Sequence, residues 1–129
     1  MNAKIPIIAR YLLGLLFFAS GLAGLLNLAP PPTDMPPKLA AFFAGISSTG
    51  YFIPFLKITE TACGLMLLAR IAPALALIIL AQVTINIVLV HTFLTPGLQN
   101  LILPSIIVIL HLVSAMAYWP IYRPLFGRK

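Results

Sequence analysis

Two ionisable side chains, Lys57 and Glu60, interrupt an apolar stretch that covers residues 52–69. They are three positions apart, so in a helix they share one face and can form an ion pair. A charged group inside a membrane costs about 2.5–3.5 kcal/mol on insertion scales, and such groups tend to mark ligand or proton pathways. We therefore expect Glu60 to serve ligand binding or proton transfer, with Lys57 as its partner.

Further polar residues fall in the apolar stretches that follow. Gln82 and Asn86 are spaced i, i+4 and share one face of the third stretch, and His111 lies in the fourth. Counting along each helix from the short turns that join the stretches places His111 level with Thr84. The same count predicts one polar layer, about 8–15 Å below the outer surface. Its members are Lys57, Glu60, Gln82, Asn86 and His111.

Other interpretations of these residues stay open. Polar side chains in a membrane bundle often act only as interhelical hydrogen-bond partners, each contributing about 0.6 kcal/mol. For Gln82 or Asn86 alone we favour that structural role. No metal site is predicted, because Glu60 and His111 supply only two ligands, and His91 lies about two turns from His111 in depth, too far to share a haem iron. The single cysteine, Cys63, excludes an intrachain disulfide.

The elements that must position these residues are four long apolar blocks. They cover residues 7–28, 52–69, 72–93 and 101–119. About 20 apolar residues in a helix cross a hydrocarbon layer of about 30 Å. The composition agrees, with 61% hydrophobic residues, 8% charged residues and a mean hydropathy of +1.09. The sequence predicts an all-α, four-helix transmembrane bundle that forms a single domain over residues 1–129.

The segment between the first two blocks carries a shorter pattern. Leu39, Phe42, Phe43 and Ile46 follow an i, i+3, i+4, i+7 spacing after a proline pair, which predicts a short amphipathic helix at the outer surface. In the first block, Ser20 and Gly24 form a small-xxx-small pair that allows close helix approach.

Charge predicts how the bundle sits in the membrane. The net charge of +6 does not indicate nucleic-acid binding here, because the basic residues flank apolar spans. Lys38 lies on one side, and six basic residues lie on the other. The positive-inside rule therefore places both termini in the cytoplasm. The six residues are Lys4, Arg10, Arg70, Arg123, Arg128 and Lys129. Tyr118, Trp119 and Tyr122 are expected to anchor the inner interface.

In several short motifs the chain resembles the DoxX family of small bacterial membrane proteins. The motifs are the stretch 9–17 with Ser20-Gly21-Leu22, the loop segment 38–42, Glu60 with 64–68, Arg70, Pro73-Ala74 and Val90-His91. Two positions depart from the family pattern: Gly24, near which relatives often carry lysine, and Asn100, near which they carry an acidic residue.

The resemblance implies a four-helix bundle in the bacterial inner membrane and a link to redox biology. Some members are subunits of a thiosulfate:quinone oxidoreductase, and others associate with superoxide dismutase and thiol oxidoreductases. The family pattern carries over to Glu60, His91 and Arg10 of this chain.

Two functional hypotheses follow. The first is a membrane subunit or accessory protein of a redox system that binds a quinone or a lipid. An apolar slot beside Phe52, Phe55 and Phe93, with Glu60, His91 and His111 as polar groups, would suit such a ligand. The second is a non-enzymatic scaffold or assembly partner in which the polar layer only fixes helix register. We expect a protein partner or a second copy in either case, and the sequence does not decide whether the chain is an enzyme.

Overall fold

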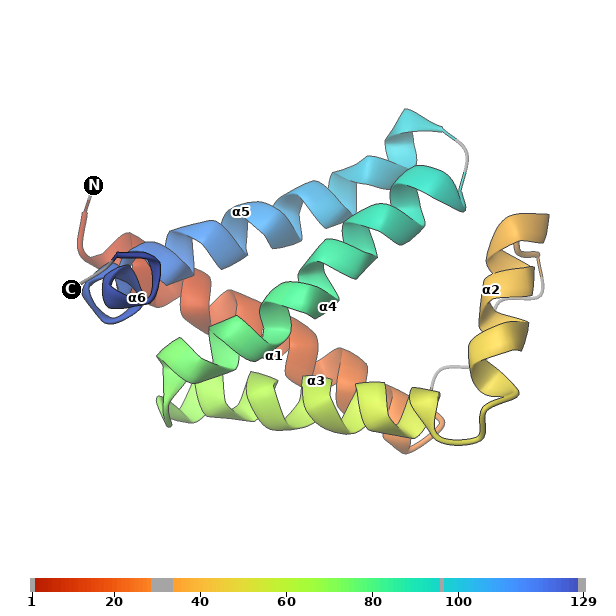
Figure 1. Ribbon diagram of the computed structural model, residues 1–129, viewed down its shortest axis with the longest axis horizontal. Helices are drawn as coiled ribbons and strands as arrows, with labels where there is room; N and C mark the ends of the chain where they lie inside the picture. The colour runs from red at the N-terminus through yellow and green to blue at the C-terminus, as the bar shows by residue number, and fades with distance from the viewer. Residues whose placement is uncertain (1, 29–33, 96, 128–129) are drawn as a thin grey trace.

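The structure, a computed structural model, describes residues 2–28, 34–95 and 97–127 and is built of helices (Figure 1). No strand occurs within these residues, and the predicted all-α fold is confirmed. The elements are α1 (Lys4–Leu25), α2 (Pro37–Ser47), α3 (Phe52–Ala69), α4 (Pro73–Phe93), the 3-10 helix η1 (Leu98–Leu101), α5 (Ile102–Met116) and α6 (Trp119–Phe126). Arg128 and Lys129, which entered the charge count, lie outside the described residues.

Within the described residues, four helices are long and apolar enough to cross a membrane. They are α1, α3, α4 and the joined stretch of η1 and α5 over 98–116. The protein is a multi-pass membrane protein whose helices contact the lipid bilayer. The bounds of α3 are those predicted, and α4 begins one residue later than predicted. The first helix is displaced: it starts at Lys4 and ends at Leu25, not at residue 28.

A residue with left-handed backbone conformation explains where α1 and α3 end. Asn27 follows α1 with φ 54°, and Arg70 follows α3 with φ 58°. After each of them, the next backbone N–H donates to the carbonyl five residues back, at 2.9 Å in both cases. This arrangement satisfies carbonyls of the last helical turn that would otherwise lack a partner. At Asn27 this turn ends α1 before residue 28. At Arg70 it begins the tight connection from α3 to α4.

The helix α6 was not predicted. The fourth apolar block was expected to continue to residue 119, but α5 ends at Met116 and a new helix starts at Trp119. Pro120 explains the break, because it has no backbone N–H to donate to the carbonyl of Met116, as a continuous helix would require. The hydroxyl of Tyr122 donates to the carbonyl of Ala74 at 2.7 Å, which ties α6 to the first turn of α4.

The four long helices form a ring. Each packs against the next long helix along the chain, and α5 packs against α1. α1 packs most extensively against α3, and α3–α4, α4–α5 and α5–α1 contacts complete the ring. Neighbouring helices run antiparallel, so both chain termini lie at the end that carries α6 (Figure 1). The core is apolar apart from its one thiol and is formed by Leu13, Phe17, Cys63, Leu67, Ala76, Leu77, Leu80, Val83 and Ile107.

Glycines bring α1 and α3 into backbone contact. A Cβ on Gly64 would lie 2.8 Å from the carbonyl oxygen of Gly14, and a Cβ on Gly21 would lie 2.8 Å from the carbonyl oxygen of Lys57. A carbon atom and a carbonyl oxygen cannot approach so closely, so these positions require glycine. Of the predicted pair, Gly24 does lie against α3, at the side chain of Lys57, whereas Ser20 is exposed and takes no part in the contact.

The far end of the bundle is more open. From the end with the termini, the α4–α5 pair diverges from the α1–α3 pair, and α2 lies at the opposite end (Figure 1). The predicted short helix is present, with Leu39, Phe42 and Ile46 half-buried and Phe43 exposed. α2 contacts α3 and buries no residue fully.

Candidate functional site

Lys57 and Glu60 form the predicted ion pair. The Nζ atom of Lys57 lies 3.4 Å from Oε1 of Glu60. The Glu60 residue is 5% exposed, and the side chain of Lys57 is 24% exposed. Because α3 is regular here, the i, i+3 spacing places both groups on one face. Among the described residues, each group has the other as its only hydrogen-bond partner.

A glycine of α1 makes room for the lysine. A Cβ on Gly24 would lie 2.6 Å from Cδ of Lys57. The aliphatic part of Lys57 therefore crosses α1 where α1 has no side chain. This contact keeps the methylene groups packed while the ammonium reaches Glu60.

The pair lies deep in its span. Glu60 is eight residues from the first residue of α3 and nine from the last, so it lies about 12 Å from either end of the helix. At that depth neither water nor lipid headgroups surround an exposed side chain. An ion pair at that depth needs its two groups close together, and here both lie on the same helix.

His111 is also buried, and both of its ring nitrogens have partners in the bundle. Nε2 lies 3.0 Å from the carbonyl oxygen of Leu77, and Nδ1 lies 3.0 Å from Oγ1 of Thr84. The carbonyl can only accept, so Nε2 carries the proton. In the neutral ring, the Thr84 hydroxyl then donates to Nδ1. The predicted level of His111 with Thr84 is confirmed, but neither nitrogen is left for a ligand or a metal.

Gln82 and Asn86 do not join Glu60. Both are exposed and line a groove of about 320 Å³ between α3 and α4, on the face of these helices that points away from the core. The groove is otherwise lined by Phe52, Phe55, Leu56, Thr59, Ile79 and Val83. The prediction of one converging polar layer is therefore wrong, because α4 turns Leu80 and Val83 toward the core.

Arg10 is buried in the N-terminal half of α1 and acts on α3. Its Nη1 donates a hydrogen bond to the carbonyl of Leu67, in the last turn of α3. Its guanidinium also lies 4.4 Å from the ring centroid of Tyr11. The last carbonyls of a helix lack intrahelical partners and carry partial negative charge. Arg10 thus caps α3, and no ligand is needed to explain its burial.

His91 is half-buried near the C-terminal end of α4. Its Nδ1–H donates to the carbonyl of Ile87 at 2.8 Å. In the neutral ring this leaves Nε2 as an acceptor. Within the part of the chain that the structure describes, no interaction links His91 to Glu60, Gln82 or Asn86.

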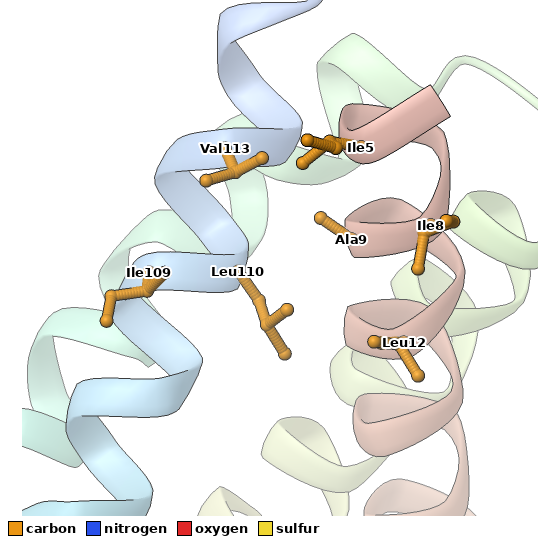
Figure 2. A pocket seen from close by; sticks show the side chains of 7 residues that line it. All are labelled: Ile5, Ile8, Ala9, Leu12, Ile109, Leu110 and Val113. Atoms are coloured by element: carbon orange, nitrogen blue, oxygen red, sulfur yellow. The ribbon is translucent and has the colours of Figure 1, made fainter. Parts of the chain in front are cut away.

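The remaining grooves have apolar walls except where His111, Thr84 and Tyr122 line two of them. A groove of about 230 Å³ lies between α1 and α5, where Ala9 and Leu110 point toward the facing helix (Figure 2). Its seven lining side chains carry no polar group, so it can hold a hydrocarbon chain but cannot do chemistry. Among the described residues, no three His, Cys, Asp or Glu side chains lie close enough to hold a metal ion.

No protein-family model, curated protein or solved structure matches the chain. Family membership stays a prediction from the motifs. Sequence reasoning placed Thr84 level with His111 without naming it as the hydrogen-bond partner, and it missed the carbonyl of Ala74 as the acceptor for Tyr122. Threonine in an apolar span was a usable signal for the first, whereas a backbone carbonyl leaves none.

Proposed function

We propose that this protein is an integral membrane subunit or accessory of a redox system, and that it binds a quinone or a lipid carbonyl at the Lys57–Glu60 pair. The observation that carries the proposal is the ion pair itself, held at 3.4 Å in the middle of a span. A pair with only a structural role could form at the membrane surface, without the free-energy cost of placing charged groups in the hydrocarbon layer. The depth of the Lys57–Glu60 pair therefore favours a functional role.

The chemistry of the pair suits a neutral ligand with carbonyl oxygens. The ammonium of Lys57 has three N–H donors and uses one on Glu60. A quinone or ester carbonyl can accept one of the others, while Glu60 keeps the site electrically neutral. Electrons would come from the partner protein, because the only thiol, Cys63, is packed in the core. The protein is thus proposed to bind and position, not to catalyse.

Location and orientation belong to the same proposal. The basic residues Lys4, Arg10, Arg70 and Arg123 lie on the side of the chain termini, and Lys38 lies on the other. This asymmetry supports both termini in the cytoplasm of a bacterium and the protein in its inner membrane.

Quinone content tests the proposal directly. We expect quinone to be extracted from protein purified out of native membranes, and Lys57→Met to lose it. Methionine keeps the apolar stem without the donors. Lys38→Met, which removes a lysine from exposed α2, is the matched control and should retain the ligand. Equal ligand content in both variants, or none in the parent, would reject a site at Lys57.

A second candidate is a scaffold that assembles other membrane proteins. It is favoured by Gln82 and Asn86, whose amides are exposed in a membrane span. Such groups act as interhelical hydrogen-bond partners. If co-purification from cross-linked native membranes returns a defined partner and no quinone, the scaffold is the better account.

A further inference from the structure

A stripe of exposed residues runs along the outward face of α4. Leu75, Gln82 and Leu89 are spaced by seven residues, and each is exposed. Ile78 and Asn86 lie beside them on the same face. A seven-residue spacing of this kind is the pattern of a helix that packs along another helix. In the described chain no helix covers this stripe.

The two amides on the stripe lack partners. Within the described residues, neither Gln82 nor Asn86 makes a hydrogen bond through its side chain. Each amide group offers one acceptor oxygen and two donor hydrogens. Burying such a group in hydrocarbon without hydrogen bonds is unfavourable, so the amides require a partner outside this chain.

Depth decides what kind of partner can reach them. Gln82 is the tenth of the 21 residues of α4, and Asn86 lies one turn further outward. Headgroups lie about 15 Å from the centre of the hydrocarbon layer, so a phospholipid does not bring its polar part to Gln82, whereas Lys57, five residues from the first residue of α3, lies nearer to the surface. Another transmembrane helix can, because its side chains are available at every depth.

We propose that a second copy of this chain covers the stripe, so that the protein is a dimer related by a two-fold axis along the membrane normal. The proposal deepens the scaffold alternative and rests on it. Two copies inserted in the same orientation place Gln82 opposite Gln82 and Asn86 opposite Asn86 at equal depth. Because an amide is both donor and acceptor, each pairs with its own copy, as an isologous interface requires. The α3–α4 groove beside them has room for side chains of the partner's helix.

Thiol cross-linking in native membranes tests the dimer. Leu89→Cys places a thiol on the stripe, and Ile106→Cys places one on α5. The two parent residues are matched: Leu89 is 46% exposed and Ile106 47%, and each lies four residues from the outer end of its helix. Cys63 is buried, so the parent chain provides the background. We expect Leu89→Cys to give a cross-linked species of about 28 kDa, twice the 14.0 kDa of the chain, and Ile106→Cys to give none.

The amides are tested by removing them. Gln82→Leu with Asn86→Leu, added to Leu89→Cys, should weaken self-association about tenfold, as expected for the loss of interhelical amide hydrogen bonds. These side chains have no partner within the described chain, so the melting temperature of the monomer in detergent should not fall. Unchanged cross-linking in this variant would contradict the proposed role of the amides.

The outcomes separate this inference from the function on which it rests. A cross-linked species of another mass at Leu89→Cys would overturn the second copy but keep a scaffold with a different partner. The absence of a species of about 28 kDa from Leu89→Cys would overturn the second copy, whereas the scaffold, whose partner need not carry a thiol at this face, stands or falls with the co-purification experiment above. Equal 28 kDa yields from Leu89→Cys and Ile106→Cys would show random collision and would also reject the dimer.

Discussion

Glu60 and His111 differ in what their polar atoms contact. Both nitrogens of His111 are used by Leu77 and Thr84, which belong to the helix next to it. The carboxylate of Glu60 has a single partner three residues away on its own helix, and it therefore joins no two helices. A structural hydrogen bond stabilises a bundle most when it joins two helices, so His111 has a structural role, whereas the ligand role of Glu60 is the proposal made above.

His111→Ala should lower stability. It leaves the hydroxyl of Thr84 without its buried partner and opens a cavity, which together cost about 2–4 kcal/mol. Leu112→Ala, at the exposed neighbour, is the control and should change the melting temperature in detergent little. An unchanged melting temperature for His111→Ala would contradict the structural assignment.

Tyr122 makes stability depend on alkaline pH. Burial, with a smaller contribution from nearby Tyr118, raises the pKa of Tyr122 to about 12, above the value of about 10 for an unfolded tyrosine. The folded state thus favours the neutral hydroxyl, and this contribution is complete below pH 10 and is lost between about pH 10 and 12. Tyr122→Phe should therefore melt lower at pH 8 and lose less stability than the parent across that window. Tyr51→Phe, at an exposed position, should follow the parent at every pH.

At the scale of elements, the length of each apolar block predicted the four spans, because crossing a membrane fixes a length. The rotation of α4 about its axis was not predictable in this way. The helix is apolar on all sides apart from a few residues, so no face is marked by sequence. Its rotation follows from the burial of Leu80 and Val83 in the core, in one cluster with residues of α1, α3 and α5, and this turned Gln82 and Asn86 outward. Pro120 signalled a break in the sequence, but the span was predicted to end next to it, at residue 119, whereas α5 ends at Met116.

The contact of α1 with α3 gives an element-scale prediction. Gly64→Ala should destabilise the protein by about 1–3 kcal/mol, because the new methyl group would meet the backbone of Gly14 and Phe18. Gly45→Ala in α2 is the matched control, since nothing lies within 4 Å of the methyl group it would add. Alanine is the better helix former, so this control should be neutral or slightly stabilising. Equal melting temperatures for the two variants would contradict the close approach of the helices.

At the scale of the whole molecule, an even number of spans places both termini at one end, as Figure 1 shows. The charge asymmetry predicts that this end is cytoplasmic. In intact cells, an impermeant thiol reagent should label Asp34→Cys and should not label Gly127→Cys until the membrane is opened. Both positions are exposed, so access depends only on the side of the membrane. The reverse pattern would invert the proposed orientation.

The most direct test of the proposed site is Glu60→Gln, measured for stability and function together. Glutamine has nearly the same shape and can still accept a hydrogen bond from Lys57, but it carries no charge and exchanges no proton. Asp34→Asn, at the other acidic residue of the chain, is the control. We expect Glu60→Gln to melt within a few degrees of the parent in detergent and to fail to complement a strain that lacks the protein, whereas Asp34→Asn complements. Full complementation by Glu60→Gln would contradict a ligand or proton role for Glu60 and leave the scaffold as the function of the protein.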